Sequence, residues 1–215
     1  MSSRERILAR IRKLQGRGGA VSAAEREQIE TYLRRHPRGP LRELGHDLSG
    51  LFRTRAEAAS STVERVSFLH EAPAAIARYL DAQKLPKSGC VWPQLAHLDW
   101  RPAGLALEPR AARGDDPLGV TGVFCAIAET GTLMLCSGPQ TPATASLLPE
   151  THVAIVPASR IVAYMEDAWD LARAESGQLP RAVNFISGPS RTADIEQTIV
   201  LGAHGPYRVH ILLVD

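Results

Sequence analysis

The sequence predicts an α/β fold: a mostly parallel mixed sheet flanked by helices, with an N-terminal helical arm. Over residues 1–60, apolar residues recur at helical spacing in narrow stripes. After residue 60, short apolar runs alternate with helical patterns, which is typical of a parallel sheet. The runs 123–128 and 133–137 are joined by a glycine-containing turn, which predicts an antiparallel hairpin and makes the sheet mixed. We therefore expect two parts, an arm over 1–60 and an α/β domain over 61–215.

Capping patterns define the helices of the arm. Ser2 with Glu5 forms a capping box that starts the first helix, and Ser22 with Glu25 starts the second, which ends before Pro37. Two shorter helical segments are expected after them, over 41–48 and 51–59.

The elements of the domain follow from the apolar runs in chain order. Helices are expected at 72–82 and 161–174, where apolar residues share one face. Strands are expected at 62–66, 89–92, 105–107 (an edge strand), 123–128, 133–137, 153–156, 183–187 and 209–214.

The lengths of the apolar runs also indicate where in the cell the protein is located. The longest are of strand length, and none approaches the roughly 18 residues that a membrane-spanning helix requires. The first residues are polar and charged and lack the apolar segment of a secretory signal. The sequence therefore predicts a cytoplasmic protein with no membrane span.

Charge is unevenly distributed. Residues 1–60 hold thirteen Lys and Arg against seven Asp and Glu, a net charge of +6, while the rest holds twelve against sixteen, or −4. A basic arm is one mark of a nucleic-acid-binding protein. The arginines are, however, interleaved with glutamates, and no groove-reading motif is present. We expect a solvated helix face, or a surface for a partner protein, and no nucleic acid.

The three cysteines, Cys90, Cys125 and Cys136, are far apart in the sequence. No C-x-x-C pair occurs, and the histidines lack metal-type spacing, so neither a zinc site nor an iron–sulfur cluster is indicated. We expect structural thiols and no metal or other cofactor.

Three glycine-bearing turns at the ends of apolar runs are the candidate site. They are residues 127–133, 187–196 and 201–206. In open α/β sheets, ligands bind at strand ends. We expect the three turns to converge around one electropositive hollow.

The second turn is the richest in hydrogen-bond donors. Gly188 permits close approach of the backbone to a ligand, and Ser190, Arg191 and Thr192 offer hydroxyls and a guanidinium. If a helical turn begins at Thr192, its free N–H groups form an anion site. Alternatively, the hydroxyl of Ser190 or Thr192 merely caps a short helix while Arg191 pairs with Asp194 or Glu196.

Glu129 and His204 are the candidate catalytic residues. A carboxylate at a strand end can act as nucleophile or general base, but Glu129 is equally a turn residue facing solvent. His204 can bind an anion or move a proton, or it can simply fix its loop. The other predicted ligand-binding residues are Thr121, Thr130, Gly131, Thr132, Asp194, Gly202 and Gly205.

Motifs of common enzyme classes are missing. The sequence has no G-x-S-x-G, no Walker A loop and no G-x-G-x-x-G after a strand. This excludes the commonest nucleophile-elbow, P-loop and Rossmann assignments.

Four blocks of the sequence together resemble the LUD domain family. They are GVTG at 119–122, IAETGT at 127–132, SGPSRTADIE at 187–196 and GAHGP at 202–206. The similarity extends over roughly residues 60–215. It implies a fold like that of ribose-5-phosphate isomerase and the CoA transferases.

The resemblance also implies a function. It suggests a non-redox component of bacterial L-lactate utilization, the oxidation of L-lactate to pyruvate, acting with iron–sulfur partner proteins and binding a small carboxylate or phosphate. The alternative is a free-standing enzyme that acts on a phosphorylated or CoA-linked small molecule through Glu129 and His204. Whether this chain catalyses a step itself stays open.

Overall fold

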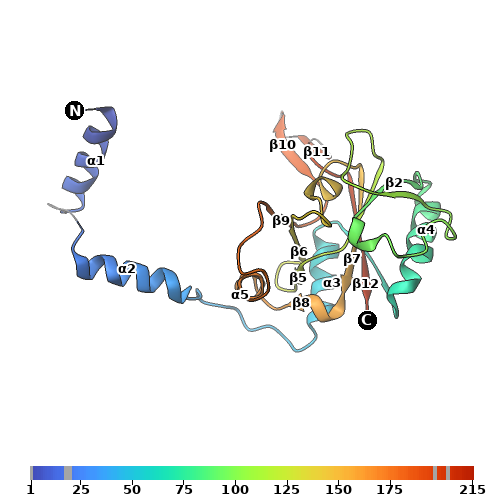
Figure 1. Ribbon diagram of the computed structural model, residues 1–215, viewed down its shortest axis with the longest axis horizontal. Helices are drawn as coiled ribbons and strands as arrows, with labels where there is room; N and C mark the ends of the chain where they lie inside the picture. Colours follow the sequence, from blue (N-terminus) through green and yellow to red (C-terminus); the bar gives the residue numbers. More distant parts are fainter. Residues whose placement is uncertain (1, 17–20, 196–197, 202–203) are drawn as a thin grey trace. The chain divides into compact units, whose positions relative to one another are not determined.

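The computed structural model describes residues 2–16, 21–195, 198–201 and 204–215, with the side chains of 192–201 outside that description. The chain forms two compact units, Met1–Leu41 and Arg42–Asp215. Figure 1 shows the elements of both.

The first unit contains α1 (Ser3–Leu14) and α2 (Ala23–Arg35). Both predicted capping boxes are confirmed: the Glu5 N–H donates to Ser2 Oγ at 3.3 Å, and the Glu25 N–H donates to Ser22 Oγ at 3.2 Å. No residue of either helix is buried. Local capping and helix propensity therefore define these helices, without a core of their own.

Helix α3 (Leu48–Ala58) belongs to the second unit, although the sequence pattern placed it in the arm. Its N-cap is Asp47, whose Oδ1 accepts from the Gly50 N–H at 2.8 Å. Phe52 and Ala56 are fully buried in the main core. The helix predicted over 41–48 is wrong, because residues 41–47 are not helical and the Asp47 cap starts the helix at Leu48.

The main sheet has six strands, all parallel, in the order β1-β12-β7-β4-β2-β3. Helix α4 (Ala72–Gln83) and α3 lie on opposite sides of it (Figure 1). The predicted α/β fold with a mostly parallel sheet is thus confirmed. The strands are β1 (Thr62–Val66), β12 (Arg208–Val214), β7 (Thr151–Pro157), β4 (Leu118–Thr121), β2 (Ser88–Val91) and β3 (Ala106–Pro109).

Strand β4 escaped the sequence prediction, although all four of its residues are buried. Its run is short and begins Leu118-Gly119, a pattern more typical of a turn. A Cβ at Gly119 would overlap the carbonyl oxygen of Ala145. The glycine therefore permits close packing of the 3-10 helix Ala143–Ser146 against the sheet.

A second sheet has the order β8-β5-β6-β9 and contains the predicted hairpin. One of its faces contributes Ala126, Leu133 and Leu135 to the main core, and the other packs against α5. Because side chains alternate across a strand, each face has its own set of apolar residues. Its elements are β8 (Ile161–Val162), β5 (Cys125–Ile127), β6 (Thr132–Cys136), β9 (Val183–Ile186) and α5 (Met165–Ser176).

Strands β10 (Arg191–Ile195) and β11 (Thr198–Leu201) pair antiparallel, so Thr192 lies in a strand and does not start a helix. The helical turn considered at Thr192 is therefore wrong. Threonine, isoleucine and valine are concentrated in this segment, and such β-branched residues favour strands. Within the described ranges, no helix is long and apolar enough to cross a membrane.

Candidate functional site

The first two predicted turns meet through a chain of hydroxyl groups. Thr130 Oγ1 donates to Thr132 Oγ1 at 2.8 Å, and Thr132 Oγ1 lies 2.7 Å from Ser187 Oγ. The β5–β6 turn is thereby joined to the end of β9.

The second turn also adjoins the third. The Ser190 N–H donates to the carbonyl oxygen of Pro206 at 2.9 Å. A Cβ at Gly205 would lie 3.3 Å from the Cβ of Ser190. Residues near 130, 190 and 205 are thus linked in space, although they are distant in the chain.

The C-terminal end of α3 packs against these turns. Gly131 and Gly188 have positive φ; a Cβ on Gly131 would overlap the backbone of α3 at Ala56, and one on Gly188 would overlap the carbonyl oxygen of Ala59, the C-cap residue of α3. Arg191 Nη2 donates to the Ala59 carbonyl oxygen at 3.3 Å. The close approach that these glycines permit is to a helix of the same chain. Their ligand-binding role, like that of the neighbouring polar residues, stays a prediction.

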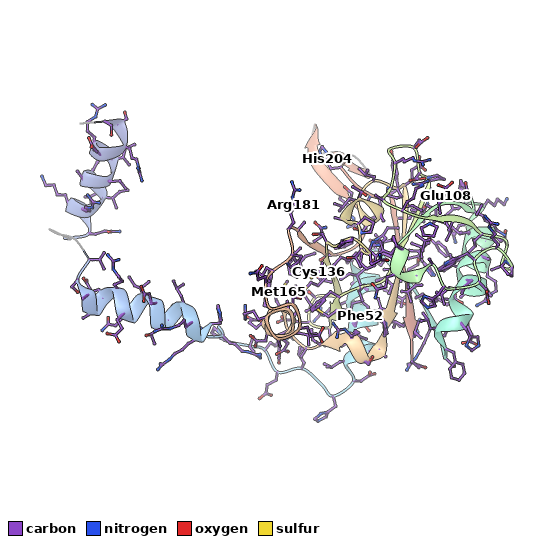
Figure 2. The ribbon with its side chains drawn as sticks, in the orientation of Figure 1. Phe52, Glu108, Cys136, Met165, Arg181 and His204 are labelled. Atoms are coloured by element: carbon purple, nitrogen blue, oxygen red, sulfur yellow. The ribbon has the colours of Figure 1, made fainter. Side chains whose placement is uncertain are left out.

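The two candidate catalytic residues, Glu129 and His204, differ in burial. Glu129 is half-buried at the start of the β5–β6 turn, where its N–H donates to the Ala163 carbonyl oxygen at 3.1 Å. His204, labelled in Figure 2, is exposed in the loop before β12. No hydrogen bond or ion pair joins the two side chains within the described ranges. Thr192 and Asp194 lie in β10, and Gly202 falls outside the described residues.

The three turns lie near the amino ends of the main strands. Pro206 leads into β12, and the segment that they contact, residues 56–61, leads into β1. Ligands of open α/β sheets bind outside the carboxyl ends. The opposite edge is therefore the expected place for a ligand.

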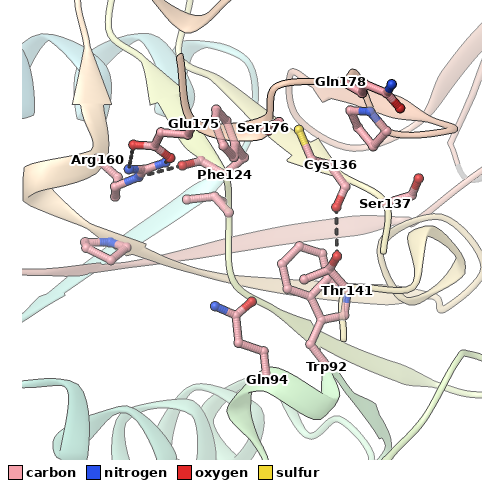
Figure 3. A pocket seen from close by; sticks show the side chains of 13 residues that line it. Trp92, Gln94, Phe124, Cys136, Ser137, Thr141, Arg160, Glu175, Ser176 and Gln178 are labelled. Atoms are coloured by element: carbon pink, nitrogen blue, oxygen red, sulfur yellow. Dashed lines mark hydrogen bonds and ion pairs between the residues drawn. The ribbon is translucent and has the colours of Figure 1, made fainter. Parts of the chain in front are cut away.

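A hollow of about 510 Å³ lies at that carboxyl edge (Figure 3). Trp92 lines it directly after β2, Val123 and Phe124 follow β4, and Pro157 ends β7. Trp92 is almost fully buried, and its Nε1 donates to the Pro142 carbonyl oxygen at 3.1 Å. The hollow thus has a fixed aromatic wall over three strand ends.

Arg160 is the cationic residue of this hollow. It follows β7 in a short 3-10 helix (Ala158–Arg160), and its Nε donates to the Phe124 carbonyl oxygen at 2.7 Å. Nη1 and Nη2 donate to the two carboxylate oxygens of Glu175 at 2.8 and 2.9 Å. This pairing raises the pKa of Arg160 and lowers that of Glu175. Other polar lining residues are Gln94, Ser137, Thr141, Ser176 and Gln178.

Arg160 keeps hydrogen-bonding capacity for a ligand. A guanidinium has five N–H donors, and the bonds to Phe124 and Glu175 use three of them. The side chain is 28% exposed at the rim of the hollow. A positively charged guanidinium in that position suits an anionic group such as a carboxylate.

Thr121, a predicted ligand-binding residue, is instead buried at the end of β4. Its Oγ1 lies 2.8 Å from His152 Nε2. Burial lowers the pKa of His152 to about 3, so the imidazole is neutral at physiological pH.

The cysteines have unreactive surroundings. Burial raises the pKa of Cys90 to about 11 and that of Cys125 to about 12, and it also raises the pKa of Cys136, which lines the hollow. All three are therefore thiols at neutral pH. In the part of the chain that the structure describes, no group of three or more His, Cys, Asp or Glu residues is arranged to hold a metal ion.

Sequence reasoning missed Trp92, Arg160 and Glu175. Trp92 is the last residue of one predicted strand, 89–92, and Arg160 follows another, 153–156, by four positions; a place at a strand end is the signal that could have identified them. The glycine-rich turns, on which the prediction of the site was based, lie at the other edge of the sheet.

The chain is an α/β protein with a ligand-sized hollow at the carboxyl ends of its parallel strands. The LUD domain family model matches residues 94–214, more than half of the chain. The chain therefore belongs to the LUD domain family.

Curated relatives match part of the chain. Over 101 residues it is 44% identical to lactate utilization protein C 1 of Bacillus mycoides (strain KBAB4), covering 46% of this chain and 43% of the relative. It is 42% identical over 101 residues to lactate utilization protein C of Bacillus subtilis (strain 168), covering 46% and 42%. The chain thus spans somewhat under half the length of these relatives.

A solved structure confirms the fold. A DUF162 family protein from Deinococcus radiodurans superposes with a TM-score of 0.59 at 22% sequence identity. The match covers 80% of this chain and 100% of that one.

Proposed function

We propose that this protein is a non-redox component of L-lactate utilization that binds a small carboxylate in the carboxyl-edge hollow. Its membership of the LUD domain family and its similarity to proteins named lactate utilization protein C support the process. The hollow supports the ligand class. The three isolated cysteines support a non-redox role, because no cluster-binding motif occurs in the sequence.

The observation that carries the proposal is Arg160 at the rim of the hollow. Its positive charge attracts a carboxylate, which can accept from one of the two remaining N–H donors or displace Glu175 from the paired ones. Gln94, which lines the same space, offers an amide to a 2-hydroxyl or 2-keto oxygen. Thr141 Oγ1 donates to the Cys136 carbonyl oxygen at 2.9 Å and can still accept from a 2-hydroxyl group. Binding and orientation of the acid by this chain would leave electron transfer to other proteins.

Those other proteins are proposed to be iron–sulfur proteins of the same lactate-oxidising system. The sequence supports this division, since the chain supplies too few cysteines for a cluster. Copurification of the tagged full chain with cysteine-rich, iron-containing proteins from lactate-grown cells tests the partnership. Iron-free preparations under those conditions would argue against it.

Ligand binding is tested by isothermal titration calorimetry and thermal shift with L-lactate, pyruvate and inorganic phosphate. Binding of either acid raises the melting temperature. Arg160→Gln is expected to weaken acid binding at least tenfold. Arg173→Gln is the matched control, because Arg173 pairs with Asp170 and does not line the hollow. Equal acid affinity in wild type and Arg160→Gln would contradict this site.

A second candidate function is an enzyme that acts on a phosphorylated or CoA-linked small molecule through Glu129 and His204. One observation favours it: the half-buried Glu129 carboxylate has no hydrogen bond or ion pair within the described ranges. Turnover of an acyl-CoA or sugar phosphate by the isolated protein, lost in Glu129→Gln, would support this candidate. Inertness towards both substrate classes would reject it.

A further inference from the structure

The carboxyl-edge hollow adjoins a second, smaller one. The second hollow has a volume of about 180 Å³ and shares Gln94, Val123 and Pro157 with the first. These three residues form the boundary between the two spaces. A ligand seated in the first hollow therefore borders directly on the second.

The second hollow is apolar where the first is polar. Leu95 and Ile155 are buried in its wall, while Leu69 is 37% exposed at its rim. Its polar lining residues are Gln94 and the exposed His97, whose Nδ1 lies 3.1 Å from the Gln94 carbonyl oxygen, and none of its lining residues is Lys, Arg, Asp or Glu. Such a surface attracts hydrocarbon and offers little to a carboxylate.

The first hollow is also too large for a three-carbon acid. Lactate has six heavy atoms, and even at about 30 Å³ for each, the liquid volume of a whole water molecule and therefore an upper bound, it fills at most roughly 180 Å³. The hollow of about 510 Å³ lies in the range that accommodates considerably larger ligands. A bound lactate alone would leave most of it to water.

We propose that the ligand is a carboxylate that carries an apolar or aromatic group, and that Leu69, Leu95 and Ile155 select that group. Its carboxylate pairs with Arg160, and its apolar part passes Gln94 and Val123 into the second hollow. This proposal rests on the ligand site proposed above and names the class of acid that the site prefers. Longer 2-hydroxy or 2-keto acids fit this description, whereas lactate occupies only the polar half.

Affinity is expected to increase with apolar length. Each methylene group that is fully buried tightens binding about fourfold. Titration calorimetry on the full chain would compare L-lactate, 2-hydroxyhexanoate and L-3-phenyllactate. Phenyllactate should bind at least tenfold more tightly than lactate. Equal or tighter binding of lactate would overturn the proposal.

A variant at the rim of the second hollow distinguishes the contributions of the two hollows to binding affinity. Leu69→Asp should weaken phenyllactate binding at least fivefold and leave lactate binding within twofold of wild type. Leu148→Asp is the matched control, since Leu148 is 49% exposed and lines neither hollow. An unchanged ratio of the two affinities in Leu69→Asp would overturn the selective role of Leu69 and its hollow.

The same titrations distinguish the failure of this proposal from the failure of the site itself. If lactate binds, depends on Arg160 and gains nothing from an added apolar group, only the preference for larger acids is rejected. If none of the three acids binds, both the site and the preference are rejected. If Arg160→Gln weakens binding of all three acids while Leu69→Asp weakens binding of only 2-hydroxyhexanoate and phenyllactate, both the site and the preference for larger acids are supported.

Discussion

The guanidinium of Arg160 and the carboxylate of Glu175 are paired through two hydrogen bonds of 2.8 and 2.9 Å at the rim of the hollow. Glu175 lies in the last turn of α5, where a negative charge is unfavourable to the helix dipole. It also occupies the donors of Arg160 that best suit a bidentate anion. Glu175 is therefore placed to compete with a bound acid.

Glu175→Gln should raise the affinity for carboxylates about threefold to tenfold, because it removes the competing charge and leaves the Arg160 guanidinium in place. Titration calorimetry with a single acid measures the change. Glu166→Gln, in the first turn of the same helix and outside the hollow, is the control. Weaker binding by Glu175→Gln would show that the carboxylate positions Arg160 instead of competing for it.

Two buried histidines make stability depend on pH. His152 and His210 lie on the adjacent strands β7 and β12, and each has one buried ring nitrogen without a hydrogen-bond partner in the described structure. The His210 ring stacks on Tyr79, with 3.8 Å between the ring centroids. Burial lowers the pKa of His152 to about 3 and that of His210 to about 4.

The unfolded chain takes up these two protons near pH 6.5, while the folded protein resists protonation down to about pH 4. Their stabilising contribution is complete above pH 6.5 and decreases as the pH falls from 6.5 towards 4. Each histidine contributes up to about 1.4 kcal/mol per pH unit. Urea unfolding at pH 7.5, 6 and 5 measures the decline, which His210→Gln should make shallower. An identical slope in that variant would refute the assignment.

Gly188 and Gly104 have nearly the same φ, +81° and +80°, but different surroundings. A Cβ at Gly188 would overlap the Ala59 carbonyl oxygen, whereas at Gly104 it would meet nothing within 4 Å. Gly104→Ala should therefore cost only the backbone strain, about 1–2 kcal/mol of unfolding free energy. Gly188→Ala should cost at least about 1 kcal/mol more, because overpacking typically costs 1–3 kcal/mol. Chemical denaturation compares the two; equal losses would mean that α3 does not need this close contact.

Phe52 tests the position of α3 in the second unit. The side chain is fully buried in the main core, so Phe52→Ala should lower the unfolding free energy by about 3–5 kcal/mol. Ile29→Ala in α2 is the comparison, because Ile29 is 48% exposed and its loss should cost less than about 0.5 kcal/mol. A small effect of Phe52→Ala would place α3 with the arm, as the sequence pattern suggested.

Elements with a strong local signal were predictable. The capping boxes at Ser2 and Ser22 and the turn at Gly131 depend on residues within a few positions of one another. Strand β4 was missed because its four residues resemble a turn and become a strand only between β2 and β7. The helix predicted from residue 161 begins at Met165, because Ile161–Val162 pairs with β5 instead.

The candidate site was less predictable than the fold. The sequence indicated that the three turns share one region, and hydrogen bonds link residues near 130, 187, 190 and 206. It did not indicate that α3 lies against Gly131 and Gly188, because that contact joins residues more than seventy positions apart. The hollow at the opposite edge was missed because its lining residues, from Trp92 to Pro180, are also far apart in the chain.

Composition, periodicity and capping by themselves determined the fold class and most of the helices and strands, because those features depend on neighbours in the chain. Only the tertiary structure decided which strand ends meet at one edge, and so which residues surround a hollow. Apolar runs of similar length can pair in many orders, and the order is settled by long-range packing that no local pattern encodes. For this reason the sequence identified Arg191 as a candidate binding residue, whereas only the tertiary structure identified Arg160.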